Sequence, residues 1–415
     1  MDDQEVQRLV DVANVTFGHP FSSSEFNNDK RGLPLIRIRD LGADEVTVYT
    51  TQTDYPASAE VRTGELLVGM DAEFSPYIWR LGRSLLNQRV CRLEPKSNLE
   101  SDRVYLRAAL LQPLTELQNS KSATTVIHLN KSDLERIHVR WPRVNQRAAI
   151  ANALGALDEK IELNRRMNAT LEAMARALFQ SWFVDFDPVH AKAEGRQPVG
   201  MDAETAALFP DSFEDSALGP IPTGWEIRPL DEIAHFLNGL ALQKFPVSGS
   251  TSLPVIKIAQ LNNGHDTTRA DRCSDNIPQD YVVRDGDVLF SWSGSLEVEV
   301  WTGGDGALNQ HLFKVSSQTY PKWFYYLWTI SHLENFRSIA AGKATTMGHI
   351  QRKHLSDAKV LVPASVLLLK MGELLSPLVA SNTAQMLQAK ELERLRDTLL
   401  PKLLSGELSV GDVAA

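Results

Sequence analysis

The sequence contains few cysteines and no long apolar run. Cys91 and Cys273 are its only two cysteines, and unpaired thiols are typical of a reducing compartment. No apolar stretch reaches the roughly 18 residues of a membrane span. The N-terminal stretch MDDQEVQRLV is too polar for a signal peptide. These absences predict a cytoplasmic protein that does not enter a membrane.

The chain also lacks an excess of positive charge. It contains 43 Lys and Arg residues and 52 Asp and Glu residues, which gives a formal net charge of −9. Segment 186–224 holds two basic and seven acidic residues and so accounts for more than half of that excess. The rest of the chain is near neutral. Near-neutral domains can still present one basic face, so charge alone neither indicates nor excludes a nucleic-acid partner.

Catalytic motifs are missing as well. The strings FGHP (17–20) and DFDPVH (185–190) lack the spacing of a nucleotide-methylating site. AAGKATT (340–346) contains Gly-Lys but not the other residues of a phosphate-binding loop. No histidine and cysteine cluster has metal-ligand spacing. Acid pairs such as Glu297 and Glu299 are predicted to be solvated surface charges. The sequence therefore predicts no enzyme, no metal site and no cofactor.

The most informative feature is a single order of landmarks that occurs twice. The offset between copies stays between 220 and 222 residues, which is far too long for a solenoid repeat. A duplicated domain is predicted, and with it a target that has two similar halves. The paired landmarks are LPLIRI (33–38) with LPVIKI (253–258), VRTGELL (61–67) with VRDGDVL (283–289), Trp79 with Trp301, LNQ (86–88) with LNQ (308–310), ATT (123–125) with ATT (344–346), and Trp141-Pro142 with Val362-Pro363.

Each half begins with a turn-rich part in which short apolar runs are separated by Gly, Asp and Pro. This pattern predicts strands and turns. Gly64 and Gly286 each precede an acid and an apolar run, which indicates a tight turn that leads into a strand. In segments 103–117 and 322–339 apolar residues recur every three or four positions. That spacing predicts one packed helix in each half.

A long helix with an apolar seam closes each half. The seam advances in steps of four and three, as in a coiled coil. Pro142 and Pro363 precede the helices, Gly406 follows the second, and Pro401 is expected to kink or end it near Leu400. The seam positions are Ile150, Leu154, Leu157, Ile161, Asn164, Asn168, Leu171, Ala175, Leu178 and Trp182 in the first helix, and Met371, Leu375, Leu378, Asn382, Gln385, Ala389, Leu392, Leu399 and Leu403 in the second, where Arg396 interrupts them.

The centre of both seams is polar, at Asn164 and Asn168 in one helix and Asn382 and Gln385 in the other. If the helices pair antiparallel and in step, these amides face each other. Buried amides weaken a coiled coil but fix its register. In the alternative interpretation the centres are exposed and the amides are solvated. Both copies carry amides at the same place, so we favour a facing polar layer.

Side chains suited to DNA base edges occur in both halves. Arg and Lys bind guanine and Asn and Gln bind adenine. The repeated Asn-Gln pair is better explained as scaffold, because two domains that read different sequences should not share their readers. Loops after residues 17, 68, 239 and 290 are better placed to read bases. The DNA-binding candidates are Lys30, Arg31, Arg37, Arg39, Arg83, Asn87, Gln88, Arg89, Lys244, Lys257, Gln260, Asn262, Asn309, Gln310, His311 and Lys343.

The repeated strings, together with NQRAAIANALGALDEKIELNRRMNATLEAMARALFQSWFVDFDPV (145–189) and GMDAETAALFPDSFEDSALGPIPTGWE (200–226), resemble the specificity subunits of type I DNA restriction-modification systems. The resemblance covers essentially the whole chain. It departs from the family at the N-terminus, which has no equivalent of Trp225. It also departs at 362–374, where a pair like Gln146-Arg147 is expected.

The resemblance implies a mixed α/β fold with two target-recognition domains. Each is followed by a long helix, the two helices pair as an antiparallel coiled coil, and a pseudo-twofold axis relates the halves. The predicted parts are recognition domain 1 (1–143), spacer helix 1 (144–185), an acidic linker (186–224), recognition domain 2 (225–363), and spacer helix 2 with a C-terminal tail (364–415).

The resemblance also implies the partners. They are double-stranded DNA, two methylating subunits that use S-adenosylmethionine, and restriction subunits that use ATP and Mg²⁺, while the chain itself catalyses nothing and holds no cofactor. Phe179, Trp182 and Phe183 are candidates for an outer surface that binds the methylating subunits. In the equally weighted alternative they cap the coiled coil where it meets the domains. Two competing functions are a coiled-coil scaffold with two domains for non-DNA ligands, and an enzyme with an unrecognised site.

Overall fold

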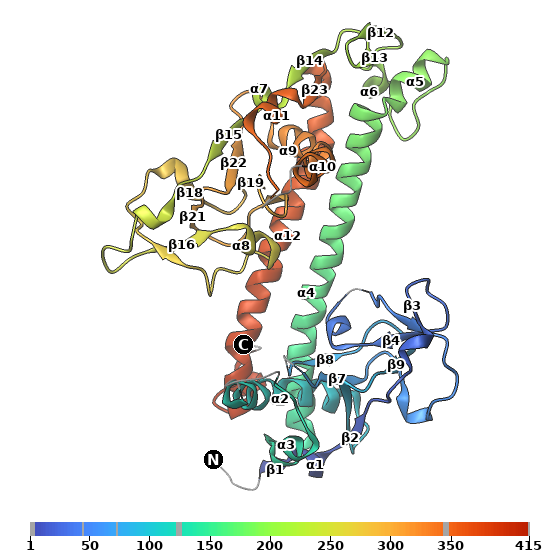
Figure 1. Cartoon of the computed structure of the whole chain (residues 1–415), viewed down its shortest axis with the longest axis vertical. Helices are drawn as coiled ribbons and strands as arrows, with labels where there is room; N and C mark the ends of the chain where they lie inside the picture. The colour runs from blue at the N-terminus through green and yellow to red at the C-terminus, as the bar shows by residue number, and fades with distance from the viewer. Residues whose placement is uncertain (1–4, 44, 72–73, 122–126, 343–347, 414–415) are drawn as a thin grey trace. The chain divides into compact units, whose positions relative to one another are not determined.

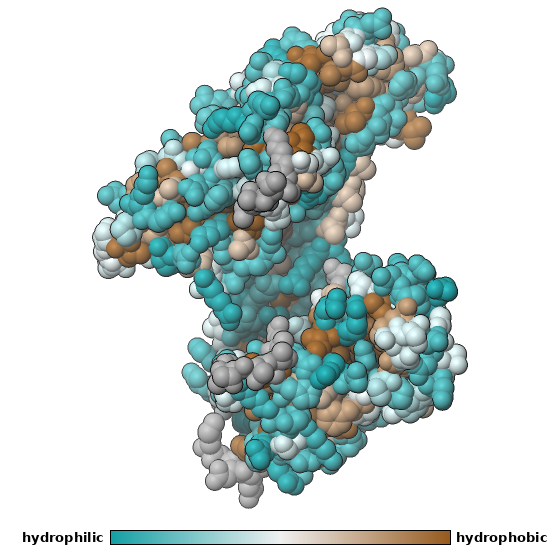
Figure 2. Space-filling view, in the orientation of Figure 1, coloured by the Kyte–Doolittle hydropathy of each residue, from teal (hydrophilic) through white to brown (hydrophobic). Residues whose placement is uncertain are grey.

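The computed structural model describes residues 5–43, 45–71, 74–121, 127–342 and 348–413 (Figure 1). The predicted α/β class is confirmed. The chain forms two compact units, of which unit 1 comprises residues 1–161 and 391–415 and unit 2 comprises residues 162–390. Among the described helices, none is long and apolar enough to cross a membrane. Hydrophilic residues dominate the face drawn in Figure 2, and its hydrophobic areas are small.

Unit 1 contains two sheets and a covering helix, α2 (Glu100–Lys121). A separate antiparallel pair, β1 (Val6–Arg8) and β11 (His138–Arg140), closes its base. The four-stranded sheet has the order β2 (Ala13–Phe17), β10 (Val90–Pro95), β7 (Leu66–Gly69) and β8 (Pro76–Ile78). The five-stranded sheet has the order β3 (Phe26–Asn27), β5 (Tyr49–Thr50), β4 (Leu33–Ile36), β9 (Ser84–Leu86) and β6 (Glu60–Val61).

Unit 2 repeats this plan. The pair β14 (Glu226–Pro229) and β23 (Lys359–Val362) corresponds to β1 and β11. One four-stranded sheet has the order β15 (His235–Asn238), β22 (Leu312–Ser316), β19 (Val288–Ser291) and β20 (Val298–Val300). The other has the order β17 (Arg272–Cys273), β16 (Leu253–Ile256), β21 (Gly306–Leu308) and β18 (Val282–Val283).

The local signals of the duplication have the expected structures. Gly64 and Gly286 adopt φ values of 92° and 89° and lie in the turns before β7 and β19. Glycine reaches this left-handed region without steric cost, which explains why both turns carry it. The single helix predicted over 322–339 is wrong in one respect. It is divided at His332 into α9 (Lys322–Ser331) and α10 (Leu333–Ala341).

The two long helices are α4 (Val144–Phe179) and α12 (Ser365–Ser405). A π-helical turn, η5 (Gln180–Val184), extends α4. Every predicted apolar seam position is buried or half-buried. Pro401 does not end α12, because the helix continues to Ser405 and stops at Gly406, whose φ is 76°. A glycine in this conformation is a common helix terminator.

Within each unit, α4 and α12 lie side by side and run antiparallel. In unit 1, Arg396 Nη1 donates to Asp158 Oδ1 at 2.8 Å. Arg396 therefore interrupts the apolar seam with an ion pair across the helices. In unit 2, Asn164 Nδ2 donates to Gln388 Oε1 at 2.9 Å, and Asn382 Nδ2 donates to the carbonyl of Asn168 at 3.1 Å. These two contacts confirm a facing polar layer.

The structure corrects one detail of that layer. Asn164 pairs with Gln388, which the seam pattern did not single out, rather than with Gln385. The side-chain oxygen of Gln385 is buried without a hydrogen-bond partner among the described residues, and so is Oδ1 of Asn164. Buried amide oxygens without partners cost stability. The layer therefore favours one register at an energetic cost.

Residues 186–224 form a folded part of unit 2. They contain α5 (Asp187–Ala193), α6 (Ala203–Ala207) and a hairpin of β12 (Phe213–Ser216) and β13 (Gly219–Pro222). Phe209 and Ile221 are buried in the same apolar cluster as Trp225. The predicted linker, ordered in places, is thus packed against the unit that follows it.

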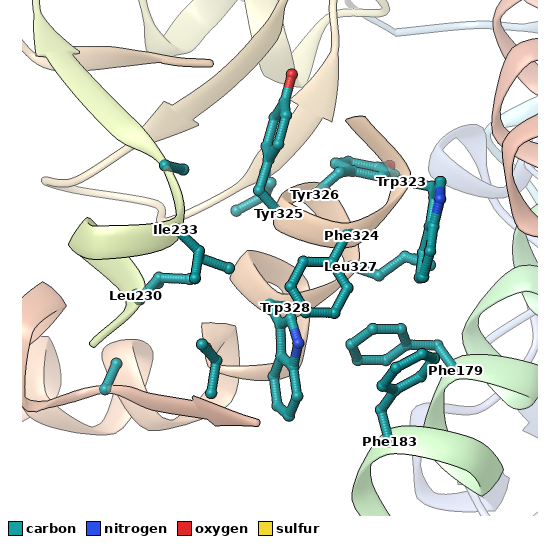
Figure 3. Close-up of a cluster of buried hydrophobic side chains, with 14 of the residues drawn as sticks. Phe179, Phe183, Leu230, Ile233, Trp323, Phe324, Tyr325, Tyr326, Leu327 and Trp328 are labelled. Atoms are coloured by element: carbon teal, nitrogen blue, oxygen red, sulfur yellow. The ribbon is translucent and has the colours of Figure 1, made fainter. Parts of the chain in front are cut away.

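This cluster also contains the three aromatic residues predicted as an outer surface. Phe179, Trp182 and Phe183 are 3%, 8% and 0% exposed. Figure 3 shows Phe179 and Phe183 directed toward the aromatic side chains of α9, and the Phe179 and Trp328 ring centroids lie 5.0 Å apart. The prediction of an exposed docking surface here is wrong. The alternative, in which they cap the coiled coil against its domain, describes the structure.

Candidate nucleic-acid interface

In each unit four loops meet at one end of a four-stranded sheet, which is β2-β10-β7-β8 in unit 1 and β15-β22-β19-β20 in unit 2. We call this meeting point the loop junction. In unit 1 the loops follow β2 and β7 and precede β10 and α3 (Lys131–Arg136). In unit 2 they follow β15 and β19 and precede β22 and α11 (Arg352–Asp357). The junction comprises residues 18–19, 70–71, 87–89 and 128–129 in unit 1, and residues 239–240, 292–293, 309–311 and 349–350 in unit 2.

Backbone hydrogen bonds connect the loops of unit 1. They run from Gly18 N–H to Val90 O (3.0 Å), from His19 N–H to Leu86 O (2.9 Å), from Met70 N–H to Arg89 O (2.9 Å) and from Leu129 N–H to Met70 O (2.7 Å). Because each bond joins segments that are distant in sequence, the loops form one rigid frame. The strands and loops thus place their side chains together at the end of the sheet.

Unit 2 has the same frame. Its bonds run from Gly239 N–H to Leu312 O (3.0 Å), from Leu240 N–H to Leu308 O (2.9 Å), from Trp292 N–H to His311 O (3.4 Å) and from Ile350 N–H to Trp292 O (3.0 Å). Each donor and acceptor lies 221 or 222 residues after its counterpart in unit 1. The duplication is therefore preserved in the backbone of the junction.

Close approach of two backbones explains the repeated LNQ segment. A Cβ atom on Gly18 would lie 1.9 Å from the Asn87 carbonyl oxygen, and one on Gly239 would lie 2.2 Å from that of Asn309. Only glycine fits at such a contact. The side chains of both asparagines accept backbone N–H groups, from Gln88 at 2.8 Å and from His311 at 3.2 Å. These contacts favour the scaffold interpretation of the repeated Asn-Gln pair.

Directly after LNQ the two units differ. In unit 1, Arg89 Nη1 forms an ion pair with Asp71 Oδ2 at 3.3 Å, and Nδ1 of His128 hydrogen-bonds to Asp71 Oδ1. The Arg89 side chain is 55% exposed and His128 is 44% exposed, whereas Asp71 is 20% exposed. The acid is thus the most buried member of the group, and the side chains of Arg89 and His128 reach the surface.

In unit 2 the same positions carry no acid. His311 Nδ1 lies 3.2 Å from Ser293 Oγ, and the rings of His311 and Trp292 are 5.8 Å apart. Trp292 Nε1 donates to Asn238 Oδ1 at 3.0 Å. His349 pairs with Ser293 in a backbone bridge, as His128 does with Asp71. This junction has an aromatic ring and a hydroxyl group, Trp292 and Ser293, where that of unit 1 has an ion pair.

The sequence named Arg89, Gln310 and His311 as candidates but missed their partners. The loops after residues 68 and 290 are predicted from the sequence to read bases, and Asp71, Trp292 and Ser293 lie in those loops. His128 and His349 belong to a part of the chain far from these loops in sequence. Only the fold brings them into the junction.

Apart from Asn87 and Gln88, the other candidates of unit 1 lie outside the junction. Arg37 donates to Asp40 and Thr47 and its side chain is only 21% exposed, so it stabilises its own loop. Arg83 is exposed and paired with Glu60, and Arg31 is exposed beside Asp29. The remaining exposed candidates are Lys30, Arg39 and Gln88, of which Gln88 belongs to the junction.

The other candidates of unit 2 divide in the same way. Gln260 is 9% exposed and its Oε1 accepts the backbone N–H of Lys257, so it caps α8 (Ile258–Asn262) and is not an accessible reader. Asn262 Nδ2 donates to Ser295 Oγ at 2.9 Å, close to the junction loop. Lys257 is exposed and paired with Asp271, and Lys244 is exposed. Lys343 lies outside the described residues.

One acid predicted to be solvated is not. Burial raises the pKa of Glu299 to about 7, and the negative charges of Glu172 and Glu297 act in the same direction. Arg176 opposes this shift. Glu297 forms an ion pair with Arg337 at 2.8 Å. Among the described residues, no group of three or more His, Cys, Asp and Glu side chains could hold a metal ion.

The family described as the type I restriction modification DNA specificity domain matches residues 1–173 and 222–393, one copy for each half of the duplication. The chain belongs to this family. Two relatives of this chain are specificity subunits of type I restriction enzymes. That of EcoBI from Escherichia coli is 26% identical over 374 residues, covering 85% of this chain and 74% of that protein. That of MjaIX from Methanocaldococcus jannaschii is 23% identical over 335 residues, covering 79% and 73%.

The fold is also found in the family. The crystal structure of a type I restriction-modification system S subunit from M. genitalium superposes with a TM-score of 0.57 at 15% identity. The match covers 96% of this chain and 95% of that one. At this identity the likeness concerns the fold alone.

Proposed function

We propose that the chain is the DNA specificity subunit of a type I restriction-modification complex, and that each unit reads one part of a two-part DNA site. In this proposal residues 1–143 and 225–363 are the recognition domains. The observation that carries it is the loop junction. Both copies keep one backbone frame, while the side chains it presents differ between them. Such a frame suits two readers that approach DNA alike and select different bases.

The long helices would act as the spacer between the two parts of the site. α4 contains 36 residues, which at about 1.5 Å per residue is roughly 54 Å. One turn of duplex DNA is about 34–36 Å. The helix is therefore long enough to span a turn of unread DNA. The polar layer at Asn164, Asn168 and Asn382 would fix the register on which this spacing depends.

In this proposal catalysis belongs to partner subunits, and the chain binds no cofactor of its own. Two methylating subunits would supply S-adenosylmethionine chemistry, and restriction subunits would supply ATP-dependent translocation and cleavage. The acidic net charge of −9 is compatible with this division, because partners can supply much of the phosphate grip. Assembly on DNA would take place in the cytoplasm.

Co-expression with the methylating partner, followed by mapping of methylated adenines, tests this proposal. We expect one modified site with two specified parts and an unspecified spacer. A modified site without two separated parts would contradict the proposal. So would methylation that ignores sequence, which is the result expected of a scaffold for non-DNA ligands.

A matched deletion of one heptad from α4 and one from α12 tests the spacer. Deleting residues 157–163 together with 390–396 removes facing segments of the antiparallel pair, because Asp158 pairs with Arg396 and Asn164, just beyond the deletion, pairs with Gln388. We expect the spacer to change while both specified parts stay the same. Deleting only 157–163 is the control, since it places the seams out of step and should abolish assembly. Altered bases in either specified part would contradict a pure spacer role.

A further inference from the structure

We propose that the residue directly after the repeated LNQ segment, Arg89 in unit 1 and His311 in unit 2, is the equivalent base-reading position of the two units. We further propose that Arg89 selects a guanine. This inference rests on the proposed DNA specificity function and names the residue within each junction that carries the discrimination. Asp71 and Ser293 act as positioning residues for these two readers.

The first observation is that the backbone at this position is the same in both units while the side chain differs. The carbonyl oxygens of Arg89 and His311 accept the equivalent N–H groups of Met70 and Trp292. The two residues therefore occupy the same place in the same frame. The preceding Leu-Asn-Gln is identical in both units. The units are thus identical through Leu-Asn-Gln and first differ at the next side chain, which is arginine in unit 1 and histidine in unit 2.

The second observation is how Arg89 is held. Its contact with Asp71 is made through Nη1, at 3.3–3.5 Å. A guanidinium has five N–H donors in a planar fork, so this contact leaves further donors for a base. His128 Nδ1 hydrogen-bonds to Oδ1 of the same carboxylate. Asp71 thus orients the guanidinium while more than half of the Arg89 side chain stays exposed.

This arrangement matches the chemistry of one base. Two parallel donors of arginine fit O6 and N7 of guanine in the major groove. Adenine presents a donor at the position of O6, so it cannot accept both bonds. A charged fork that is oriented before binding loses less conformational freedom on contact. Guanine is therefore the base that unit 1 should require opposite Arg89.

Unit 2 should not share this requirement. His311 faces Ser293 Oγ through Nδ1, and its Nε2 lies 3.4 Å from Gln310 Nε2. In the tautomer that satisfies both contacts, Gln310 donates to Nε2 and Nδ1–H donates to Ser293. The imidazole also lies beside the Trp292 ring. No guanidinium fork is present at this position, so the two parts of the site should differ here.

Selection of bound sequences from randomised duplexes by the wild-type chain in complex with its methylating partner is the test. With Arg89→Gln we expect a guanine preference at one position of one part to fall by roughly 10- to 100-fold. The other part of the site should be unchanged. Asp71→Asn should weaken the same preference without moving it to another position, which a merely structural residue would not do.

Arg8→Gln is the matched control, since Arg8 is also a half-exposed arginine of unit 1 paired with an acid, Asp11, and lies outside the junction. It should leave every position unchanged. In the reverse experiment, His311→Arg with Ser293→Asp should introduce a guanine preference into the other part of the site. Equal thermal unfolding midpoints for wild type and variants show that folding is intact.

The outcomes separate this inference from the function on which it rests. If the wild-type complex selects no sequence, the proposed function fails. If it selects a two-part site that Arg89→Gln leaves unchanged, the reading position is wrong and the function stands. A loss spread evenly over all positions would make Arg89 a phosphate contact and would overturn the inference.

Discussion

Arg147 of α4 donates two hydrogen bonds to the carboxylate of Asp102 in α2, from Nε to Oδ1 at 2.7 Å and from Nη2 to Oδ2 at 2.8 Å. The guanidinium also lies 4.4 Å from the ring centroid of Trp141. Both charged side chains are nearly inaccessible, at 9% and 0% exposed. This ion pair joins the recognition domain of unit 1 to its long helix.

Unit 2 makes the corresponding joint without charge. Trp323 of α9 stands at the position of Asp102, and Leu368 of α12 stands at that of Arg147, each 221 residues further on. Trp323 is 1% exposed and lies close to Gly372 of α12. The missing Gln-Arg pair of the second helix is thus accounted for, because an aromatic contact replaces the ion pair.

Removing Arg147 alone should destabilise unit 1 strongly. Burial by itself raises the pKa of Asp102, but hydrogen bonds from Arg147 and Ser97 outweigh it and hold that pKa below the usual carboxyl value. Arg147→Met would leave the carboxylate buried without its counter-charge. We expect a loss of about 3–5 kcal/mol of unfolding free energy in unit 1. Hydrogen exchange along α2 should report it.

The double variant Arg147→Met with Asp102→Leu is the control, because it removes both charges. Replacing a buried pair by apolar side chains is often neutral. We expect most of the lost protection of α2 to return, while exchange in α9 of unit 2 stays unchanged throughout. A double variant as unstable as the single one would show that the ion pair is not the source of the effect.

Glu299 should make unit 2 less stable as the pH rises. The folded chain holds a proton on Glu299 up to about pH 7, whereas the ordinary glutamate pKa is 4.5. Between these values the native state binds more protons than the unfolded state, so stability falls with increasing pH. Glu299→Gln should add roughly 2–3 kcal/mol at pH 8 and almost nothing at pH 4.

Urea unfolding followed by tryptophan fluorescence at the two pH values measures this difference. Glu226→Gln is the control, since Glu226 is an exposed acid of the same unit that pairs with Arg228. Its effect should be small at both pH values. A Glu299→Gln variant that is no more stable than wild type at pH 8 would contradict a raised pKa at this site.

Asn164 should lower the unfolding free energy of the helix pair while it fixes the register in which α4 and α12 pack. Its side chain is fully buried, with a single bond to Gln388 and an unpaired Oδ1. Asn164→Leu should raise the unfolding free energy by about 1 kcal/mol, because it buries apolar surface and leaves Gln388 able to reach water. Self-association should increase, because a buried asparagine restricts how helices pair.

Light scattering and urea unfolding test the two effects together. Gln388→Leu removes the partner but leaves Asn164 buried, so it should lower stability. If Asn164→Leu is less stable than wild type, the amide contributes more than its single hydrogen bond indicates.

Gly18→Ala should damage the junction of unit 1 only. The added methyl group would meet the Asn87 backbone, which cannot move without breaking the frame. Overpacking of this kind costs about 1–3 kcal/mol. Gly155→Ala in α4 is the control, since a Cβ there meets nothing within 4 Å and alanine is the better helix former by roughly 1 kcal/mol. Hydrogen exchange of β9 and β10 should rise in the first variant and not in the second.

Features with a short-range pattern could be predicted from the sequence. The seam of α4 follows from its steps of three and four, and the turns at Gly64 and Gly286 follow from glycine before an acid and an apolar run. The duplication indicated two α/β units directly. Each of these signals depends on residues that are neighbours in the chain, or on two segments that can be compared by eye.

Contacts between remote segments could not be predicted. Asp71 and His128 are 57 residues apart, and no local pattern relates them. The sequence left open whether Phe179 and Phe183 are exposed, because the residues that cover them come from α9 and from the folded segment 186–224. Glu299 looked solvated because the sequence does not show that α4 places Glu172 close to it.

Unit 1 combines two segments that are far apart in sequence, residues 1–161 and 391–415, and so it can fold only after both have been synthesised. Leu403 is buried in the same cluster as Leu154 and Leu9. The hydrophobic core of unit 1 is therefore incomplete until residues near 403 have been synthesised. Unit 2 is one uninterrupted stretch and needs nothing made later than Lys390. Domains usually mature from the N-terminus during translation. Here the unit made first should be the last to mature.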